Sequence, residues 1–243
     1  MGTKFIVFLA TAAIALGQST VDQSLDRTFN LNHVDSLRDM REIATVVRLI
    51  GDIKQVATET ERKALTVHGT PDEIALTEWL VQYLDVTDIP ADPPNSVKRR
   101  YQMLVGKNGE NVVSVFYLPH TESVQSFQEV TTVVRLIGDI RRMFTYSARR
   151  AIIARGTIEQ IDLAEWLIDQ LEQPNNAANP VKREYSVPGP GDPDTVVRVF
   201  SIKHSATPQR FQEIATQVRT TTQVRRLFTY SAPRIITLRG TPS

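Results

Sequence analysis

The stretch Thr45-Val46-Val47-Arg48-Leu49-Ile50-Gly51-Asp52-Ile53 occurs twice in this sequence, and its second copy occupies residues 132–140 without a single change. Nine identical residues at a fixed offset of 87 positions indicate that the chain was built by duplication. The architecture is therefore best analysed one repeat at a time. A duplication of this kind predicts how a chain folds and assembles, but it does not indicate a reaction.

The repeat extends well beyond this nonapeptide. Three stretches align without gaps, each running from a phenylalanine to a glycine: residues 29–69, 116–156 and 200–240. With their flanks they predict a signal peptide and three repeat units, at residues 1–17, 25–87, 97–173 and 181–243. Stretches rich in proline and asparagine separate the units, at residues 85–96 and 173–180. Such stretches predict short, stiffened linkers that hold neighbouring units close without merging their cores.

The middle unit shows its order of elements through its periodicities. A β-branched and aromatic run at residues 112–118 predicts a strand, and apolar residues at steps of three and four over residues 123–137 predict one face of a helix. Gly138 follows the last apolar position and is predicted to take the left-handed helix cap. The remaining elements are two short strands, a second helix and an extra leading strand, at residues 141–146, 151–155, 158–171 and 99–105.

This order predicts an α+β fold of tandem small βαββα units, each with two helices on one face of a three- to four-stranded sheet. The second helix of each complete unit begins with a capping signal, Thr70-Pro71-Asp72-Glu73 in the first and Thr157-Ile158-Glu159-Gln160 in the second. The third unit has Gly240-Thr241-Pro242-Ser243, where the sequence stops. We therefore expect this unit to be truncated, to lack its final helix, and to be weakly stable by itself.

The composition limits the class of protein. The chain has 243 residues, of which 41% are hydrophobic and 23% charged, as is typical of globular domains. Its 28 Lys and Arg are balanced by 27 Asp and Glu, so it lacks the basic surface expected of a nucleic-acid-binding protein. It contains no cysteine, which excludes disulfides, thiolate metal sites and a cysteine nucleophile.

The N-terminus predicts export. Lys4 provides a positive start, residues 5–16 form an apolar run, and Ala15-Leu16-Gly17 places small residues at the two specificity positions of a cleavage site. The apolar run is shorter than the ~20 residues needed to span a bilayer. We expect a cleaved signal peptide, a periplasmic or secreted protein, and no stable membrane insertion after cleavage.

No set of residues in the sequence predicts a reaction. The chain has no Gly-x-Ser-x-Gly, no His-Glu-x-x-His, no P-loop and no dinucleotide-binding motif. His33, His120 and His204 recur at equivalent positions, but no unit offers a second metal ligand at a useful spacing. We therefore expect no enzyme, no catalytic residue, no cofactor and no metal site. The histidines are interpreted as polar residues that hydrogen-bond near a helix start.

Two sets of repeated residues are candidates for interfaces. Arg48, Arg135 and Arg219 fall in the last turn of the first helix of each unit. A cation there complements the helix dipole, or it pairs with an acid on a neighbouring unit. Trp79 and Trp166 fall beside the apolar stripe of the second helix. They are either core or core-edge residues, or partly exposed anchors for the next subunit.

In both complete units an apolar strand leads through His-Gly-Thr or Arg-Gly-Thr into an amphipathic helix that closes on Leu-Asp or Leu-Glu. The residues are 64–70 with Leu84-Asp85, and 151–157 with Leu171-Glu172. This pattern, in a strand–helix–strand–strand–helix unit, resembles the periplasmic domains of bacterial secretins and covers nearly all of the chain after residue 17. The resemblance implies domains that stack into rings below an outer-membrane channel and contact partners in secretion or pilus machinery.

The sequence departs from the secretin pattern because the membrane barrel that would follow Ser243 is missing, so the channel function is not carried over. We expect an exported envelope protein that acts as a protein–protein interaction or self-assembly module, with protein partners and no nucleic acid. The alternative is a truncated fragment of a full-length secretin of a secretion or pilus system. An envelope enzyme or a glycan-binding protein is a more distant alternative.

Overall fold

A computed structural model of the chain describes residues 24–88, 99–104, 106, 109–172, 183–187 and 194–242. The expected signal peptide at residues 1–17 lies outside the described residues, as does most of each expected linker. The described ranges contain five α-helices and eleven strands, and the strands form three antiparallel sheets. The predicted α+β fold of repeated β-α-β-β-α-like units is thereby confirmed.

The first unit has the element order strand, helix, strand, strand, helix. Its elements are β1 Leu25–Asn30, α1 Leu37–Gly51, β2 Gln55–Glu59, β3 Ala64–Gly69 and α2 Pro71–Leu84. The sheet has the strand order β1-β3-β2, and β3 pairs antiparallel with both neighbours.

The second unit adds the expected leading strand. Its elements are β4 Arg100–Gln102, β5 Val112–Tyr117, α3 Val124–Ile137, β6 Arg142–Tyr146, β7 Ala151–Gly156 and α4 Ile158–Glu172. The third unit repeats this order as far as the last strand, with β8 Arg183–Ser186, β9 Val196–Ser201, α5 Pro208–Thr222, β10 Arg226–Tyr230 and β11 Ile235–Gly240. The two four-stranded sheets have the equivalent orders β4-β5-β7-β6 and β8-β9-β11-β10. The predicted boundaries between units remain predictions.

The second helices start at the predicted capping signals. The Thr70 hydroxyl accepts from the Glu73 amide at 3.3 Å, and the Glu73 carboxylate accepts from the Thr70 amide at 2.8 Å. Thr157 and Gln160 form the same reciprocal pair at 3.3 and 3.0 Å. Each pair satisfies two helix amides that have no partner inside the helix, which is worth about 1 kcal/mol.

The prediction that Gly138 takes the left-handed cap of the first helix is wrong. Gly138 has a φ of −75°, and the next residue, Asp139, takes the left-handed conformation with a φ of 53°. Asp52 does the same after α1, with a φ of 62°. At the equivalent position of the first unit, Gly51, a glycine is needed for a steric reason. A Cβ on Gly51 would lie 2.8 Å from the Ile53 side chain. The glycine therefore lets the following isoleucine fold back over the helix end.

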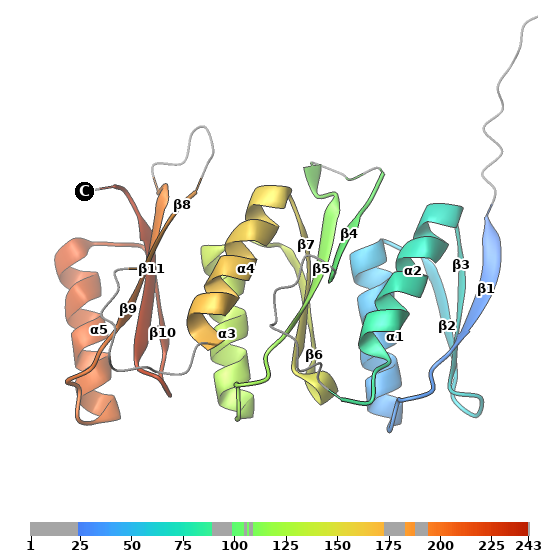
Figure 1. Cartoon of the computed structure of the whole chain (residues 1–243), viewed down its shortest axis with the longest axis horizontal. Coiled ribbons are helices and arrows are strands. Elements are labelled where there is room, and N and C mark those ends of the chain that lie inside the picture. The colour runs from blue at the N-terminus through green and yellow to red at the C-terminus, as the bar shows by residue number, and fades with distance from the viewer. Residues whose placement is uncertain are drawn as a thin grey trace, which may run out of the picture.

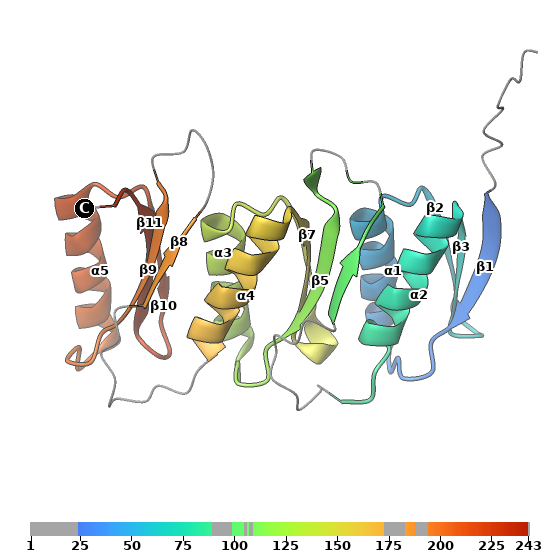
Figure 2. The ribbon, with the colours of Figure 1, turned by 45° about the horizontal axis from the view of Figure 1, so that its top comes forward.

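The units stack so that sheets and helix layers alternate along the molecule. Figures 1 and 2 show α1 and α2 between the first and second sheets, and α3 and α4 between the second and third. One buried apolar cluster joins the core of the first unit to Val113, Val115, Tyr146 and Ile153 of the second. Another joins the helices of the second unit to Val197, Val199, Tyr230 and Ile235 of the third. The prediction that the units do not merge their cores is therefore wrong.

This stacking explains why equivalent strands differ between units. On the outward face of the first sheet, Asp26 pairs with His68 and Thr28 pairs with Thr66, and the two threonine hydroxyls are 3.0 Å apart. In the second unit the equivalent face is covered by the helices of the first, and Val115 pairs there with Ile153. The outward face of the first sheet is thus polar, where the equivalent face of the second sheet is apolar.

The far end of the stack is polar for the same reason. Val46 and Val133 are buried on α1 and α3, whereas the equivalent residue on α5 is the exposed Gln217. Ile50 and Ile137 are likewise fully buried, but their counterpart Thr221 is exposed. Two apolar contacts that would hold a following sheet are therefore absent from α5.

The shared core predicts that the first two units unfold together. Ile153→Ala removes a buried side chain of the second sheet that packs in the core of the first unit, and should cost about 2–5 kcal/mol. Thr66→Ala, the equivalent change on the outward face of the first sheet, should cost less than about 0.5 kcal/mol. Urea unfolding followed by circular dichroism measures both. Equal costs for the two variants would contradict a core shared between units.

Candidate interaction surfaces

The junction between successive units is built twice from equivalent residues. In the first junction the carboxylate of Glu42 on α1 accepts from the backbone amide of Ser147 at 2.9 Å. In the second, the carboxylate of Glu129 on α3 accepts from the amide of Ser231 at 2.7 Å and from its hydroxyl at 2.9 Å. The turn after β6 or β10 is thus held against the first helix of the preceding unit.

At each junction a buried arginine of the following unit donates a second hydrogen bond to the preceding unit. The guanidinium of Arg155 on β7 donates to the carbonyl of Ile50 at 2.8 Å, and Arg239 on β11 donates to Ile137 at 3.0 Å. Each accepting carbonyl lies at the C-terminal end of a helix, where a cation is favoured by the helix dipole. Burial lowers the pKa of Arg155 from its ordinary value, and the nearby Arg142 lowers it further.

Both tryptophans named as interface candidates lie against the next unit of the same chain. The ring centroids of Trp79 on α2 and Tyr101 on β4 are 5.6 Å apart, and those of Trp166 on α4 and Tyr185 on β8 are 5.3 Å apart. Trp79 also contacts Tyr83 at 5.0 Å. Such tilted aromatic pairs contribute about 0.5–1.5 kcal/mol beyond the area they bury. A role for these tryptophans in binding other proteins remains a prediction.

The three arginines predicted as interface residues each make the same hydrogen bond within their own unit. Arg48, Arg135 and Arg219 donate to the carbonyl oxygens of Val56, Met143 and Leu227, at 3.0, 2.6 and 2.7 Å. The arginine thereby ties the last turn of the first helix to the strand that follows it. Their use in contacts with other proteins remains a prediction.

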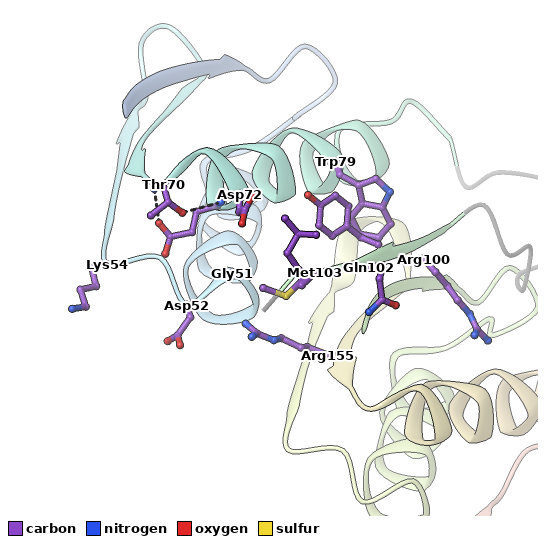
Figure 3. Close-up of a pocket in the computed structure, with 13 residues that line it drawn as sticks. Gly51, Asp52, Lys54, Thr70, Asp72, Trp79, Arg100, Gln102, Met103 and Arg155 are labelled. Atoms are coloured by element: carbon purple, nitrogen blue, oxygen red, sulfur yellow. Dashed lines mark hydrogen bonds between the residues drawn. The ribbon is translucent and has the colours of Figure 1, made fainter. Parts of the chain in front are cut away.

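A cleft of about 660 Å³ opens where the first unit meets the second, and Figure 3 shows the residues that line it. Three of its polar residues are engaged in the fold: Arg155 holds the end of α1, Thr70 caps α2, and Arg100 binds Asp162 at 2.6 Å as well as Glu165. We interpret this cleft as the open edge of the junction between the two units.

Exposed apolar side chains recur at the two ends of the first helix in the first two units. On α1 they are Leu37 and Leu49, 48% and 43% exposed, and on α3 they are Val124 and Leu136, 75% and 44% exposed. We call these four residues the side surface. A groove of about 660 Å³ beside α3 includes Val124 and Leu136 in its lining. On α5 the equivalent positions are Pro208 and Thr220, so the side surface belongs to the first two units.

Two of the three repeated histidines, His33 and His120, contribute a backbone amide to an equivalent contact. The carboxylate of Asp85, which follows α2, accepts from the amides of Asn32 and His33 at 2.6 and 2.7 Å. Glu172, at the end of α4, accepts from the amide of His120 at 2.8 Å and from the Thr121 hydroxyl. The acid that closes each second helix therefore ties it to the loop before the first helix. Within the described ranges, no three His, Asp or Glu side chains gather as metal ligands would.

The fold belongs to the class of tandem α+β units that share their cores along a stack. The solved structures similar to this chain include secretins of type II secretion systems and an N-terminal domain of one, the family that the repeat resembles. No protein-family model matches the sequence, and no curated protein matches it. In the described part of the chain, no helix is both long and apolar enough to cross a bilayer.

Three of these structures illustrate the similarity. Aeromonas hydrophila ExeD is 12% identical, with a TM-score of 0.22, over 91% of this chain and 38% of that chain. The N-terminal domain of the secretin XcpQ from Pseudomonas aeruginosa is 14% identical, with a TM-score of 0.26, over 62% of this chain and 61% of that chain. The pilotin–secretin complex AspS–GspD of ETEC is 14% identical, with a TM-score of 0.23, over 91% of this chain and 35% of that chain. This chain thus spans less than two thirds of each.

The junction arginine generates a prediction about stability. Arg155→Met keeps an apolar stem but leaves the Ile50 carbonyl without its charged donor, which should cost about 1.5–3 kcal/mol. His68→Met, the equivalent change on the outward face of the first sheet, should cost less than about 0.5 kcal/mol. Thermal and urea unfolding of both variants measure the difference. An Arg155→Met variant as stable as the native chain would contradict the role of this arginine.

Two buried tyrosines at the first junction generate a prediction about pH. Burial raises the pKa of Tyr117 and of Tyr146 to about 12, above the ordinary value of about 10. A raised tyrosine pKa contributes stability that is present below pH ~10 and is lost as the pH rises toward ~12. Tyr117→Phe should therefore reduce the loss of unfolding free energy between pH 8 and pH 11.5 by about 2 kcal/mol. Urea unfolding at the two pH values measures it, and an undiminished loss would contradict it.

Proposed function

We propose that this chain is a protein–protein interaction module of the bacterial envelope that acts as a stacked rod and associates with other copies side by side. One observation carries the proposal: the same junction, with a helix glutamate and a buried arginine, is made twice at equivalent positions. Because the junction between successive units is repeated, equivalent surfaces of the units lie at a fixed spacing along the rod. A scaffold that binds other proteins requires such a fixed spacing.

The side surface supports self-association. Leu37 and Leu49 of the first unit recur as Val124 and Leu136 of the second, so a neighbouring rod meets two equivalent apolar patches at the spacing of the stack. Two linked contacts of this kind strengthen each other, because the second forms at a high effective concentration once the first is made. Exposed apolar patches are typical of protein interaction sites.

The location in the envelope is part of the proposal. It is supported by the sequence of residues 1–17, whose charge, apolar run and small residues are typical of a cleaved export signal. Export would bring the stack to the compartment in which envelope machinery assembles. Fusion of residues 1–17 to a reporter that is active only after export tests this part separately.

Charged substitutions on the side surface test the self-association. Leu49→Lys with Leu136→Lys places a cation at both patches and should weaken association at least about tenfold, as expected for the loss of apolar anchors at an interface. Thr220→Lys is the matched control, because it makes the same change at the equivalent position of the third unit. Sedimentation velocity across micromolar concentrations measures the effect.

Two results would contradict the proposal. One is that the native chain stays a strict monomer at every concentration and also retains no protein from an envelope extract beyond what the double variant retains. The other is equal weakening of association by Thr220→Lys and by the double variant. A loss confined to the double variant would support the side surface as the site of contact.

A further inference from the structure

Each sheet has an edge strand that pairs on one side only. Among the described strands, β2, β6 and β10 lie at the ends of their sheets, and they pair with β3, β7 and β11 respectively. The free side of such a strand presents main-chain amides and carbonyls, which are a template for pairing with a strand of another chain. What occupies these groups therefore decides whether the sheets are open to extension.

The pairing pattern of the second sheet fixes which groups of β6 point outward. The amide of Leu118 donates to the carbonyl of Arg150 at 3.0 Å, so every second residue of β7, counted from Arg150, faces β5. In an antiparallel ladder successive residues face alternate sides, and the remaining residues of β7 therefore face β6. Their partners, which point inward, are Arg142, Phe144 and Tyr146. Met143 and Thr145 consequently direct their amides and carbonyls out of the sheet.

The same pattern recurs in the other two sheets. The amides of Leu31 and Ile202 donate to the carbonyls of Lys63 and Arg234, at 2.8 and 2.9 Å, in the positions equivalent to the bond described above. By the same alternation, the outward residues are Val56 and Thr58 on β2, and Leu227 and Thr229 on β10. A threonine thus stands at the same outward position of all three edge strands.

The repeated arginine of the first helix occupies one outward carbonyl on each of these edges. Arg135 donates to the carbonyl of Met143 at 2.6 Å. Arg48 and Arg219 make the equivalent bond on β2 and β10, at 3.0 and 2.7 Å. The guanidinium lies where the amide of an added strand would lie, and a charged side chain on a sheet edge opposes the approach of another strand. The arginine therefore interrupts the row of groups that a strand would need.

Two of the three edges carry a second contact of this kind. The carboxylate of Glu42 accepts from the outward amide of Ser147, and that of Glu129 accepts from the amide of Ser231. Thr145 lies between the two occupied groups of β6. Both acids belong to the preceding unit, and no residue of the described chain makes an equivalent contact with β2. The edge of the first sheet is therefore closed by Arg48 without the help of an acid.

We propose that Arg48, Arg135 and Arg219 are inhibitory contacts, each of which closes a strand-addition site on the outer edge of its sheet. Such a site would take an extended peptide segment, because it offers main-chain donors and acceptors at the spacing of a strand. While the arginine is in place, the chain associates through side chains and not by extension of its sheets. The proposal does not rest on the side surface, because its test measures a change from the native level of association.

Arg48→Met in the full chain is the first test, because β2 has no second contact. It keeps an apolar stem and frees the carbonyl of Val56. Sedimentation velocity should show association at least about tenfold tighter than that of the native chain, as one further main-chain hydrogen bond per strand allows. Arg41→Met, at an exposed position of the same helix, removes the same charge and should leave association unchanged.

A proline tests whether the new association uses the edge. Thr58→Pro removes an amide that points out of the sheet, and proline is tolerated on an edge strand where its missing amide faces outward. Combined with Arg48→Met, it should return association to the native level. By itself it should leave the native level unchanged. In the Arg48→Met chain, the amide of Thr58 should exchange its hydrogen more slowly as the protein concentration rises.

An Arg48→Met chain that associates no more tightly than the native chain would overturn the proposal. New association that persists with Thr58→Pro would overturn it as well, because association caused by misfolding does not depend on one outward amide. Exchange at Thr58 that is independent of concentration would have the same consequence. Arg135→Met should promote association less than Arg48→Met does, since Glu42 still holds the other end of β6, and equal promotion would overturn the part assigned to Glu42.

Discussion

The structure depends on one constraint: the second sheet lies between the helices of two successive units and is buried on both faces. One face of the second sheet is covered by α3 and α4 of its own unit, and the other by α1 and α2 of the first. All six residues of β5 and of β7 are buried for this reason. A small unit of this size buries little apolar surface alone, so sharing a sheet face with its neighbour supplies part of the core that it lacks.

The same constraint decides where equivalent units differ. A sheet face that receives helices carries Val, Ile and a buried arginine, as Val115, Ile153 and Arg155 show. The face that receives none carries Thr and His at the same positions, in Thr66 and His68. The differences between repeats thus follow from which neighbour each face has. They give the stack a direction, with one polar end at the first sheet and another at α5.

The sequence was sufficient to predict the elements but not the way in which the units join. The pattern of apolar residues predicted α3, α4 and β5, and short capping signals predicted the starts of the second helices. Both depend on residues close together in the chain. The merged cores depend on contacts about a hundred residues apart, as between Arg155 and Ile50. One signal was present: the run Val112-Val113-Ser114-Val115-Phe116-Tyr117 does not alternate, and a strand without alternation is typically covered on both faces. The close approach that a Cβ on Gly138 would make to the Val134 carbonyl oxygen, at 2.6 Å, has no comparable signal in the sequence.

The strands and the helix of the third unit differ in how many buried apolar contacts hold them. Its strands share the larger cluster with α3 and α4 through Val197, Val199 and Ile235, so they are anchored to the second unit. Its helix α5 packs in a separate, smaller cluster that includes Phe211 and Ala215. Stability within a protein follows the local burial of apolar side chains. The sheet of this unit therefore belongs to the stable body of the rod, while α5 has the fewest buried side chains of the described α-helices.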